Sequence, residues 1–397
     1  MKISRRTFTK QASLGALAGP LIFGSHKSIF GKEVVRVGVI GTGDRGNGLI
    51  RLIKDMDGME VVACCDIIPK RLKAAQEMTS GAAAYDDHRR LLDRKDIDAV
   101  LICTPFNTHD EMVIDALDAG KHIYCEKTMV KGMTEIQEVV GKVKQSGLVF
   151  QVGHQYHSSP LYNTVRNMIR GGYLGKITAY QCQWNRNGNW RRPVDNPEHE
   201  RLINWRMYRE YSGGLTAELC SHQIDFINWV SDSHPTKVVG FGGIDYWKDG
   251  RETFDNVHLL YEYPDGMDAS FVCTTTNSYD DYKIKILGEK GTIILDYTTG
   301  VIFAEPDEYK EKGLVDGVSG ATVKAWKSGK GAKINAPGND PTVDALKQFY
   351  HSLVHNTPVI SDIHTGAITA KCVHISLDAL YTEEVKHWKD YSELRFG

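Results

Sequence analysis

A glycine-rich turn directly after a buried strand constrains the fold of this chain more than any other feature. Five of the seven residues at positions 34–40 are apolar and β-branched, and Gly41, Gly43 and Gly46 follow in the spacing Gly-x-Gly-x-x-Gly. Apolar spacing in residues 47–53 predicts a helix, whose free N–H groups and positive dipole end can bind a pyrophosphate. We therefore predict a dinucleotide-binding turn.

The acidic residue expected in such a site is also present. A second apolar strand, residues 61–65, ends at Asp66, which lies 20 residues after Gly46. A carboxylate there accepts hydrogen bonds from the ribose hydroxyls and repels a 2′-phosphate, so we expect NAD rather than NADP as the cofactor. The alternative is an ordinary strand, turn and helix with structural glycines and a solvated Asp66. The agreement of strand, spacing and acid favours the nucleotide site.

Composition narrows the function classes. The 48 Lys and Arg residues nearly balance the 50 Asp and Glu residues, and there is no long basic run, so we expect no nucleic-acid partner. The eight cysteines show neither Cys-x-x-Cys nor Cys/His ligand spacing, which favours buried thiols over a zinc site or disulfides.

Residues 1–30 form a separate segment. Paired arginines in residues 4–10 precede an apolar stretch, residues 12–23, that is too short to span a bilayer. This pattern is typical of a twin-arginine export signal and predicts a location in the periplasm or on the outer side of the membrane, with cleavage or retention as an anchor left open. The alternative is a basic N-terminal extension without a signal. We expect no other membrane span.

The remaining chain has two different patterns. Residues 31–153 alternate strand and helix, which predicts an NAD(P)-binding Rossmann domain, a doubly wound parallel α/β sheet. Residues 154–397 contain a run of strands joined by short turns, with helices before and after them. We predict an α+β domain with a large, mostly antiparallel open sheet that binds substrate and mediates oligomers.

Nucleotide-binding folds place their ligands at the carboxyl ends of the strands. Two further predicted strands end in polar residues that we assign to the cofactor site, together with Asp44 and Arg45 of the glycine turn. These strand-end residues are Thr104, Asn107, His109, Glu126 and Lys127. Lys127 can also hydrogen-bond a substrate hydroxyl and stabilise negative charge on its oxygen, which makes it a candidate catalytic residue. Without this context, Glu126 and Lys127 would be interpreted as a surface ion pair.

A second candidate group lies in residues 211–229. On a helix, Glu218, His222 and Asp225 occupy positions i, i+4 and i+7 and share one face. A histidine held by a carboxylate can take a hydroxyl proton as hydride leaves the same carbon. Metal binding by Glu218 and His222 is an alternative, but a third ligand is missing, and we predict no metal. A histidine that only caps a polar helix face is the other alternative.

These motifs together resemble the Gfo/Idh/MocA family of nicotinamide-dependent oxidoreductases. The resemblance covers residues 34–295 and rests on the segments 41–46, 103–109, 119–127 and 213–225. It implies NAD(P) in the first domain, an open-sheet second domain whose free face commonly mediates homo-oligomers, and oxidation or reduction of a sugar, cyclitol or related polyol. Lys127 matches the lysine of the family's Glu-Lys-Pro motif, and Glu218 and His222 match its Asp-x-x-x-His pair.

The chain departs from the family pattern at three places. Thr128 replaces the usual proline, and Glu218 replaces the usual aspartate, which moves the carboxylate by about one methylene. The family often has arginine near positions 156 and 157, where this chain has Tyr156 and His157. We therefore expect a substrate that is not acidic, contacted by Gln155, Tyr156 and Asp225.

Aromatic and amide residues in segments 184–192 and 204–208 are typical of carbohydrate sites. Aromatic faces can cover the C–H face of a pyranose, while Asn and Arg bond its hydroxyls. We predict that Trp190 and Arg206 line the substrate cleft. The alternative is that these aromatic residues pack a long loop onto the sheet.

Three functional hypotheses follow. The first is an exported oxidoreductase that acts on a secondary alcohol of a sugar, polyol or glycoside with a tightly held NAD, because free nicotinamide nucleotide is scarce outside the cytosol. The second is a glycoside-cleaving enzyme that uses oxidation and elimination without net redox change. The third is a non-catalytic sugar or nucleotide sensor, supported only by Thr128 and Glu218.

Overall fold

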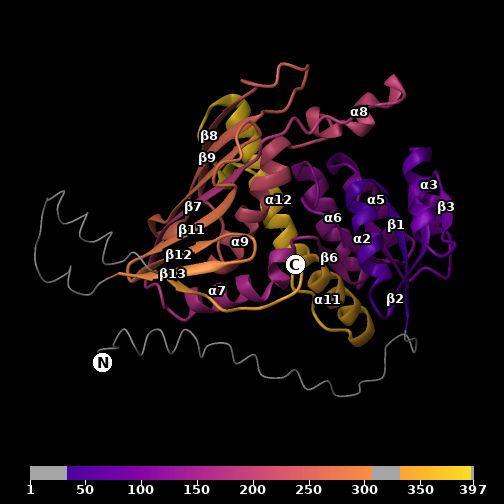
Figure 1. The fold of residues 1–397 in the computed structure, drawn as a ribbon, viewed down its shortest axis with the longest axis horizontal. Coiled ribbons are helices and arrows are strands. Elements are labelled where there is room, and N and C mark those ends of the chain that lie inside the picture. Colours follow the sequence, from indigo (N-terminus) through magenta and orange to yellow (C-terminus); the bar gives the residue numbers. More distant parts are fainter. Residues whose placement is uncertain (1–33, 306–330, 395–397) are drawn as a thin grey trace, which may run out of the picture.

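The computed structural model describes residues 34–305 and 331–394, which form two β-sheets with their associated helices (Figure 1). The predicted export segment, residues 1–30, lies outside these residues. Within the described ranges, no helix has the length and apolar character needed to cross a membrane.

The first sheet has six parallel strands in the order β3-β2-β1-β4-β5-β6, which confirms the predicted doubly wound α/β fold. Its central strand, β1, is buried at every residue but Arg36, because helices cover both faces of the sheet. The strands are β1 Val35–Ile40, β2 Met59–Cys65, β3 Ala83–Tyr85, β4 Ala99–Ile102, β5 His122–Cys125 and β6 Phe150–Val152. The helices are α2 Asp44–Lys54, α3 Pro69–Met78, α4 His88–Leu92, α5 His109–Asp118 and α6 Met133–Ser146.

The second sheet has nine strands in the order β14-β13-β12-β11-β7-β10-β9-β8-β15. Only β7 and β10 pair in parallel, so the expectation of a mostly antiparallel sheet is confirmed. Its strands are β7 Ile177–Asn185, β8 Lys237–Gly243, β9 Asn256–Glu262, β10 Asp268–Thr274, β11 Tyr282–Gly288, β12 Gly291–Leu295, β13 Gly300–Ala304, β14 Ala332–Lys333 and β15 Lys386–His387.

Helices lie on one face of this sheet (Figure 1). Leu259 and Tyr261 on β9 point into the resulting core, while Leu260 between them is 48% exposed on the other face. The helices after β6 are α7 Pro160–Arg170, α8 Glu200–Ile203, α9 Ser221–Ser231, α11 Pro341–His355 and α12 Ile363–Thr382. Short 3-10 turns include η1 Phe106–Thr108, η2 Gln155–Ser158, η3 Pro197–His199, η4 Trp205–Met207, η6 Pro264–Gly266 and η8 Trp388–Asp390.

The chain returns to the first sheet near its end. Leu346 and Phe349 of α11 join the same buried cluster as Val37 and Val39 of β1. Residues after position 340 therefore belong to the cores of both sheets, which fixes the two sheets relative to one another.

The cysteines match the sequence interpretation. All eight are free, and seven of them are buried. Burial raises the pKa of the Cys64 and Cys65 thiols to about 12, which keeps both protonated and unreactive at neutral pH.

Candidate active site

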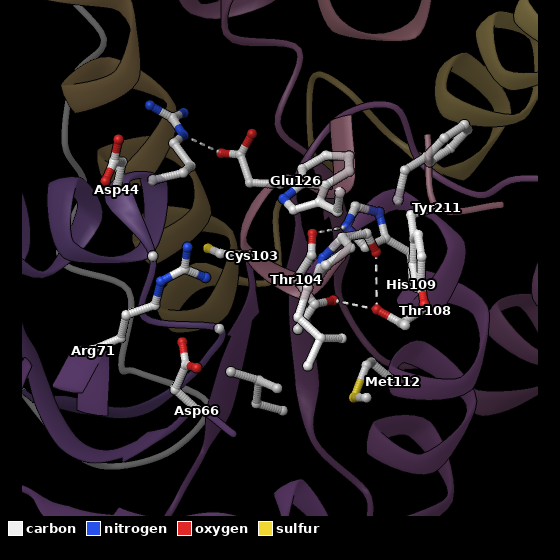
Figure 2. Close-up of a pocket in the computed structure, with 18 of the residues that line it drawn as sticks. Asp44, Asp66, Arg71, Cys103, Thr104, Thr108, His109, Met112, Glu126 and Tyr211 are labelled. Atoms are coloured by element: carbon white, nitrogen blue, oxygen red, sulfur yellow. Dashed lines mark hydrogen bonds and ion pairs between the residues drawn. The ribbon is translucent and has the colours of Figure 1, made fainter. Parts of the chain in front are cut away.

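A cavity of about 580 Å³ lies where the carboxyl ends of the Rossmann strands meet the second domain (Figure 2). Most of the residues assigned to a site from the sequence line this one cavity. They are Gly41, Gly43, Asp44, Arg45, Asp66, Thr104, His109, Glu126, Lys127, Gln155, Arg206, Glu218 and His222.

The glycine turn has the shape of a dinucleotide cradle. A Cβ atom on Gly46 would lie 2.0 Å from the carbonyl oxygen of Gly41, and one on Gly41 would lie 2.7 Å from the backbone of Cys103. The turn therefore packs tightly against its surroundings, and Gly46 supports the cavity from behind rather than lining it. Gly43 faces the cavity, and no side chain caps the amino end of α2. The backbone thus fits the pyrophosphate of a dinucleotide.

Asp66 lies at the end of β2 with both carboxylate oxygens engaged. Oδ2 accepts a hydrogen bond from the Thr42 amide at 2.8 Å, and Oδ1 accepts one from the Ile68 amide at 2.8 Å. These bonds fix the carboxylate at the wall of the cavity, where Figure 2 also shows the side chain of Arg71. In this position the Asp66 carboxylate can accept hydrogen bonds from the hydroxyls of a ribose.

His109 ties two strand ends together. Its Nε2 lies 3.0 Å from the carbonyl oxygen of Thr104, and its Nδ1 lies 3.0 Å from that of Met129. Burial lowers the pKa of His109, so the ring is neutral at physiological pH. The neighbouring Asn107 does not line the cavity, and its backbone N–H donates to the carbonyl oxygen of Tyr211.

Lys127 extends from the end of β5 toward the second domain. Its Nζ donates to the carbonyl oxygen of Glu218 at 3.1 Å. The next residue, Thr128, donates from Oγ1 to the carbonyl oxygen of Ala217 at 3.0 Å. Two consecutive side chains therefore bind the turn that carries Glu218, and the position of Lys127 is fixed without the family's proline.

Glu218 has a different partner from the one expected. The sequence predicts that this carboxylate holds His222, but Arg206 donates from Nε to Glu218 Oε2 at 2.6 Å. Burial opposes ionisation of Glu218, yet the charges of Arg206 and Lys127 hold its pKa below the ordinary value. Glu218 is therefore a buried anion between two cations.

The helix carrying these residues also differs from the prediction. Residues Thr216–Cys220 form a π-helical turn, η5, before α9 begins at Ser221. Glu218 and His222 both line the cavity, but Asp225 faces away from it and accepts a hydrogen bond from His157 at 2.8 Å. The single face expected of a regular helix is thus divided between the cavity and the buried core.

His222 lies among rings and has a free nitrogen. Its ring centroid is 6.0 Å from that of His154, 5.4 Å from that of Tyr156 and 5.5 Å from that of Trp184. Its buried Nδ1 has no hydrogen-bond partner in the described structure. Burial, followed by the charge of Lys127, lowers the pKa of His222 well below the ordinary value. The ring is therefore neutral and can accept a proton.

Besides Asp225, two residues assigned to the substrate, Tyr156 and Trp190, lie outside the main cavity. Tyr156 is buried and stacks on Tyr162 with centroids 4.3 Å apart. Trp190 packs against the core of the second domain beside Arg251, as in the alternative that the sequence left open.

Several lining residues were missed. Arg71, Trp205 and Tyr211 face the cavity, as does Arg192. Arg71 could have been found, since it lies in the first turn of the helix after Asp66. Arg192 and Trp205 lie in the segments 184–192 and 204–208, which the sequence associates with the substrate cleft, and Tyr211 begins the candidate segment 211–229. No local pattern singles out these three residues within their segments.

One group at the edge of the cavity has metal-ligand chemistry. Ligand atoms of His88, Glu111 and Asp115 lie within 4.8 Å of one another. Arg89, however, forms ion pairs with Glu111 at 2.6 Å and with Asp115 at 3.0 Å. A cation is already supplied by the chain, so we assign no metal to this group.

Comparison with known proteins matches both domains to family models. Residues 35–154 match the model described as "Oxidoreductase family, NAD-binding Rossmann fold", and residues 162–294 match the GFO/IDH/MocA C-terminal domain. The myo-inositol 2-dehydrogenase of Thermotoga maritima is 23% identical over 70% of this chain and 80% of its own. The 2,7-anhydro-N-acetylneuraminate hydratase of Mediterraneibacter gnavus is 27% identical over 66% of this chain and 68% of its own.

Solved structures share the fold. A levoglucosan dehydrogenase in complex with NADH and L-sorbose superposes with a TM-score of 0.73, covering 90% of this chain and 99% of its own at 19% identity. Together with the glycine cradle, the placed Asp66 and the two family models, these matches identify the chain as an NAD(P)-dependent oxidoreductase that belongs to the Gfo/Idh/MocA family.

Proposed function

We propose that this protein is an exported enzyme that transfers a hydride between tightly held NAD and a secondary alcohol of a sugar, cyclitol or glycoside. The observation that carries the proposal is the meeting of Lys127, Glu218 and His222 at one end of the dinucleotide cavity. These three groups supply a cation, a buried anion and a neutral base beside the strand ends where a nicotinamide is expected.

Each group has a separate role in alcohol oxidation. The glycine turn and Asp66 would hold the dinucleotide, whose nicotinamide would supply the acceptor for the hydride from carbon. His222, neutral because of its burial, takes the hydroxyl proton. Lys127 hydrogen-bonds the same oxygen and stabilises the charge that develops on it. The carboxylate of Glu218, kept ionised by the nearby charges, orients Arg206, and its backbone carbonyl oxygen orients Lys127.

A neutral polyol is the substrate class that the residues favour. Gln155 and Glu218 offer hydroxyl partners along the cavity, and the positions near 156 and 157 carry no arginine for a carboxylate. The relatives named for myo-inositol and levoglucosan act on molecules of this kind. Asp66 supports NAD over NADP, because its fixed carboxylate would repel a 2′-phosphate.

Export and cofactor retention are supported by sequence alone, since residues 1–30 lie outside the described ranges. Replacement of Arg5 and Arg6 by lysine should leave the protein in the cytosol. Fractionation of cells expressing the two forms tests this, and equal export of both would contradict the twin-arginine assignment.

A homo-oligomer is part of the proposal. The uncovered face of the second sheet exposes Phe241 at 62% and Leu260 at 48%, a surface suited to a second copy. The alternative occupant is the segment 306–340, most of which lies outside the described residues. Light scattering of the wild type and of Leu260→Asp distinguishes the two, because only a dimer or higher assembly would dissociate.

A second candidate is oxidation followed by elimination, which cleaves a glycoside without net change in the cofactor. A relative named as a hydratase of an anhydro sugar favours this chemistry, since addition of water is not a net redox reaction. Incubation with glycosides separates the candidates: aglycone released without net NADH indicates elimination, whereas stoichiometric NADH indicates a dehydrogenase.

The first experiment is to denature protein purified without added nucleotide and to identify what is released. Stoichiometric NAD or NADH supports retention and the role of Asp66. Protein that is empty and does not bind NAD when it is added would refute the proposed function.

A further inference from the structure

One long segment of the second domain, residues 186–211, crosses the cavity, and we call it the strap. It contains η3, α8 and η4, and Figure 1 shows α8 extending toward the side of the molecule that carries α3. Six strap residues, among them Arg192, Leu202 and Ile203, line the same cavity as Asp66 and Arg71. The strap therefore forms part of the nucleotide site, although it belongs to the other domain.

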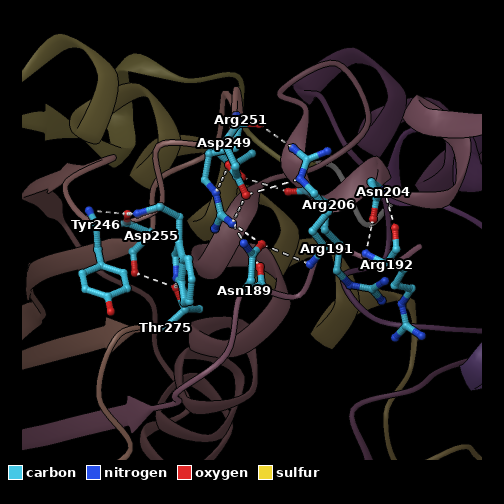
Figure 3. A network of polar contacts seen from close by, with 12 residues as sticks. Asn189, Arg191, Arg192, Asn204, Arg206, Tyr246, Asp249, Arg251, Asp255 and Thr275 are labelled. Carbon is cyan, nitrogen blue, oxygen red and sulfur yellow. Dashed lines mark hydrogen bonds and ion pairs between the residues drawn. The ribbon is translucent and has the colours of Figure 1, made fainter. Parts of the chain in front are cut away.

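Buried polar contacts hold the backbone of the strap at Arg192. The side chain of Asn204, which is only 2% exposed, accepts from the Arg192 amide at 2.7 Å and donates to the Arg192 carbonyl oxygen at 3.1 Å. The preceding Arg191 donates to Asp249, which also binds the buried Arg251. Figure 3 shows this network, with Arg192 at its edge pointing away from it. The backbone of Arg192 is fixed while its side chain stays 47% exposed.

The guanidinium of Arg192 lies at the glycine turn. Nη1 is 2.5 Å from Oδ2 of Asp44, the first residue of α2. A cation is disfavoured at the amino end of a helix unless an anion lies beside it. Here Asp44 supplies that anion, but its side chain is 74% exposed, so the pair is weak. The same place is where the turn fits a pyrophosphate.

We propose that Arg192, from the second domain, is a ligand of the cofactor diphosphate. When a dinucleotide binds, the Arg192 guanidinium leaves Asp44 and binds the diphosphate oxygens. A guanidinium can bind two phosphate oxygens at once, and this bond is stronger than an exposed pair with Asp44. Arg192 then connects the strap to the cofactor and slows its release. The inference rests on the proposed function, because it takes the ligand to be a dinucleotide.

The test compares three variants by NADH binding, NADH release, and competition by ADP or adenosine. Arg192→Ala should weaken binding of NADH and ADP by about tenfold to a hundredfold, with unchanged affinity for adenosine, which lacks phosphate. Lys70→Ala is the matched control. It removes the other exposed ion pair between strap and first domain, Lys70 with Asp195 at 2.7 Å, but Lys70 does not line the cavity. It should behave as the wild type.

Asp44→Asn separates a diphosphate ligand from a latch between the domains. If Arg192 binds the diphosphate, loss of the competing carboxylate should leave NADH release unchanged or slower. Faster release from Asp44→Asn would mean that the Asp44 pair itself holds the site closed, and would overturn the proposal.

Equal affinity of Arg192→Ala and wild type for ADP would also overturn the proposal, while leaving the proposed function intact. A wild type that binds no dinucleotide would instead refute the proposed function, and the inference with it. Thermal unfolding of each variant shows whether it is folded. Should Arg192→Ala unfold, Arg192→Gln, which keeps most of the side chain, replaces it in the same measurements.

Discussion

Two arginine–glutamate pairs flank Lys127, and they have nearly the same geometry. Arg45 donates from Nε to Glu126 at 2.6 Å, and Arg206 donates from Nε to Glu218 at 2.6 Å. In each pair the glutamate side chain is 9% exposed and the arginine about a third exposed. The pairs differ in origin, since the first connects the start of α2 to the end of β5 and the second connects the strap to η5.

The difference in origin assigns the two pairs to different parts of the cavity, which we call the cofactor half and the substrate half. Arg45 and Glu126 belong to the wall where the cofactor is expected, and the sheet fixes their positions. Arg206 and Glu218 belong to the substrate end, and their positions depend on a loop with little regular structure. Lys127 joins the two, because it directly follows Glu126 and its Nζ binds the Glu218 carbonyl. The residues of the cofactor half can therefore stay the same while those of the substrate half are changed.

The largest effect is expected from Lys127→Met, which removes the cation that follows Glu126 in the chain and binds the Glu218 carbonyl oxygen. We expect kcat to fall by about 100-fold to 1,000-fold, because an oxygen charge loses its stabilising donor. NADH affinity, measured by fluorescence, should change little. Lys142→Met is the control, since Lys142 forms an exposed pair with Asp118 away from the cavity. Full activity of Lys127→Met would exclude the assigned role.

Glu218→Gln and Glu126→Gln test whether the two halves of the cavity act separately. Each change leaves a partly buried arginine without its anion. The function that depends on that pair, alcohol turnover or NADH binding, should therefore fall by about tenfold to a hundredfold. Glu218→Gln should lower kcat/KM for the alcohol with NADH affinity unchanged, and Glu126→Gln should mainly weaken NADH binding. Identical kinetic profiles for the two variants would show that the halves are not separate.

A smaller effect is expected from Asp66→Ala, which acts on the cofactor half only. Removal of the carboxylate should shift the ratio of kcat/KM for NAD and NADP by about tenfold toward NADP, because repulsion of the 2′-phosphate is lost. Steady-state kinetics with both cofactors measure the ratio. An unchanged ratio would mean that another residue sets the preference between NAD and NADP. Arg71 would be the first candidate, because it lines the cavity.

The smallest effect is expected from pH. His222 acts as a base and its pKa is lowered well below the ordinary value, so it stays deprotonated from pH 6.5 to 8. The pKa of Glu218 is also lowered, so this carboxylate stays ionised over the same range. We expect kcat/KM to vary less than about twofold in this window and to fall only at more acidic pH. A midpoint near 7 in the pH profile would contradict this assignment.

Local sequence patterns are sufficient to place the residues of the cofactor half. Gly41, Gly43 and Gly46 between a strand and a helix define a backbone shape over a few residues, and Asp66 and Lys127 follow strands whose ends must meet at one edge of a parallel sheet. Local backbone preference and strand order are sufficient for these placements.

The residues of the substrate half are placed by contacts between segments far apart in the chain. The α-helical spacing grouped Asp225 with Glu218 and His222, but Asp225 pairs with His157 in the core, while Glu218 on the π-turn and His222 both line the cavity. Trp190 packs against the core of the second domain, whereas Arg192 reaches the glycine turn and Arg206 reaches Glu218. These outcomes depend on the path of the strap, which is set by buried contacts such as those of Asn204 rather than by any local pattern of residues.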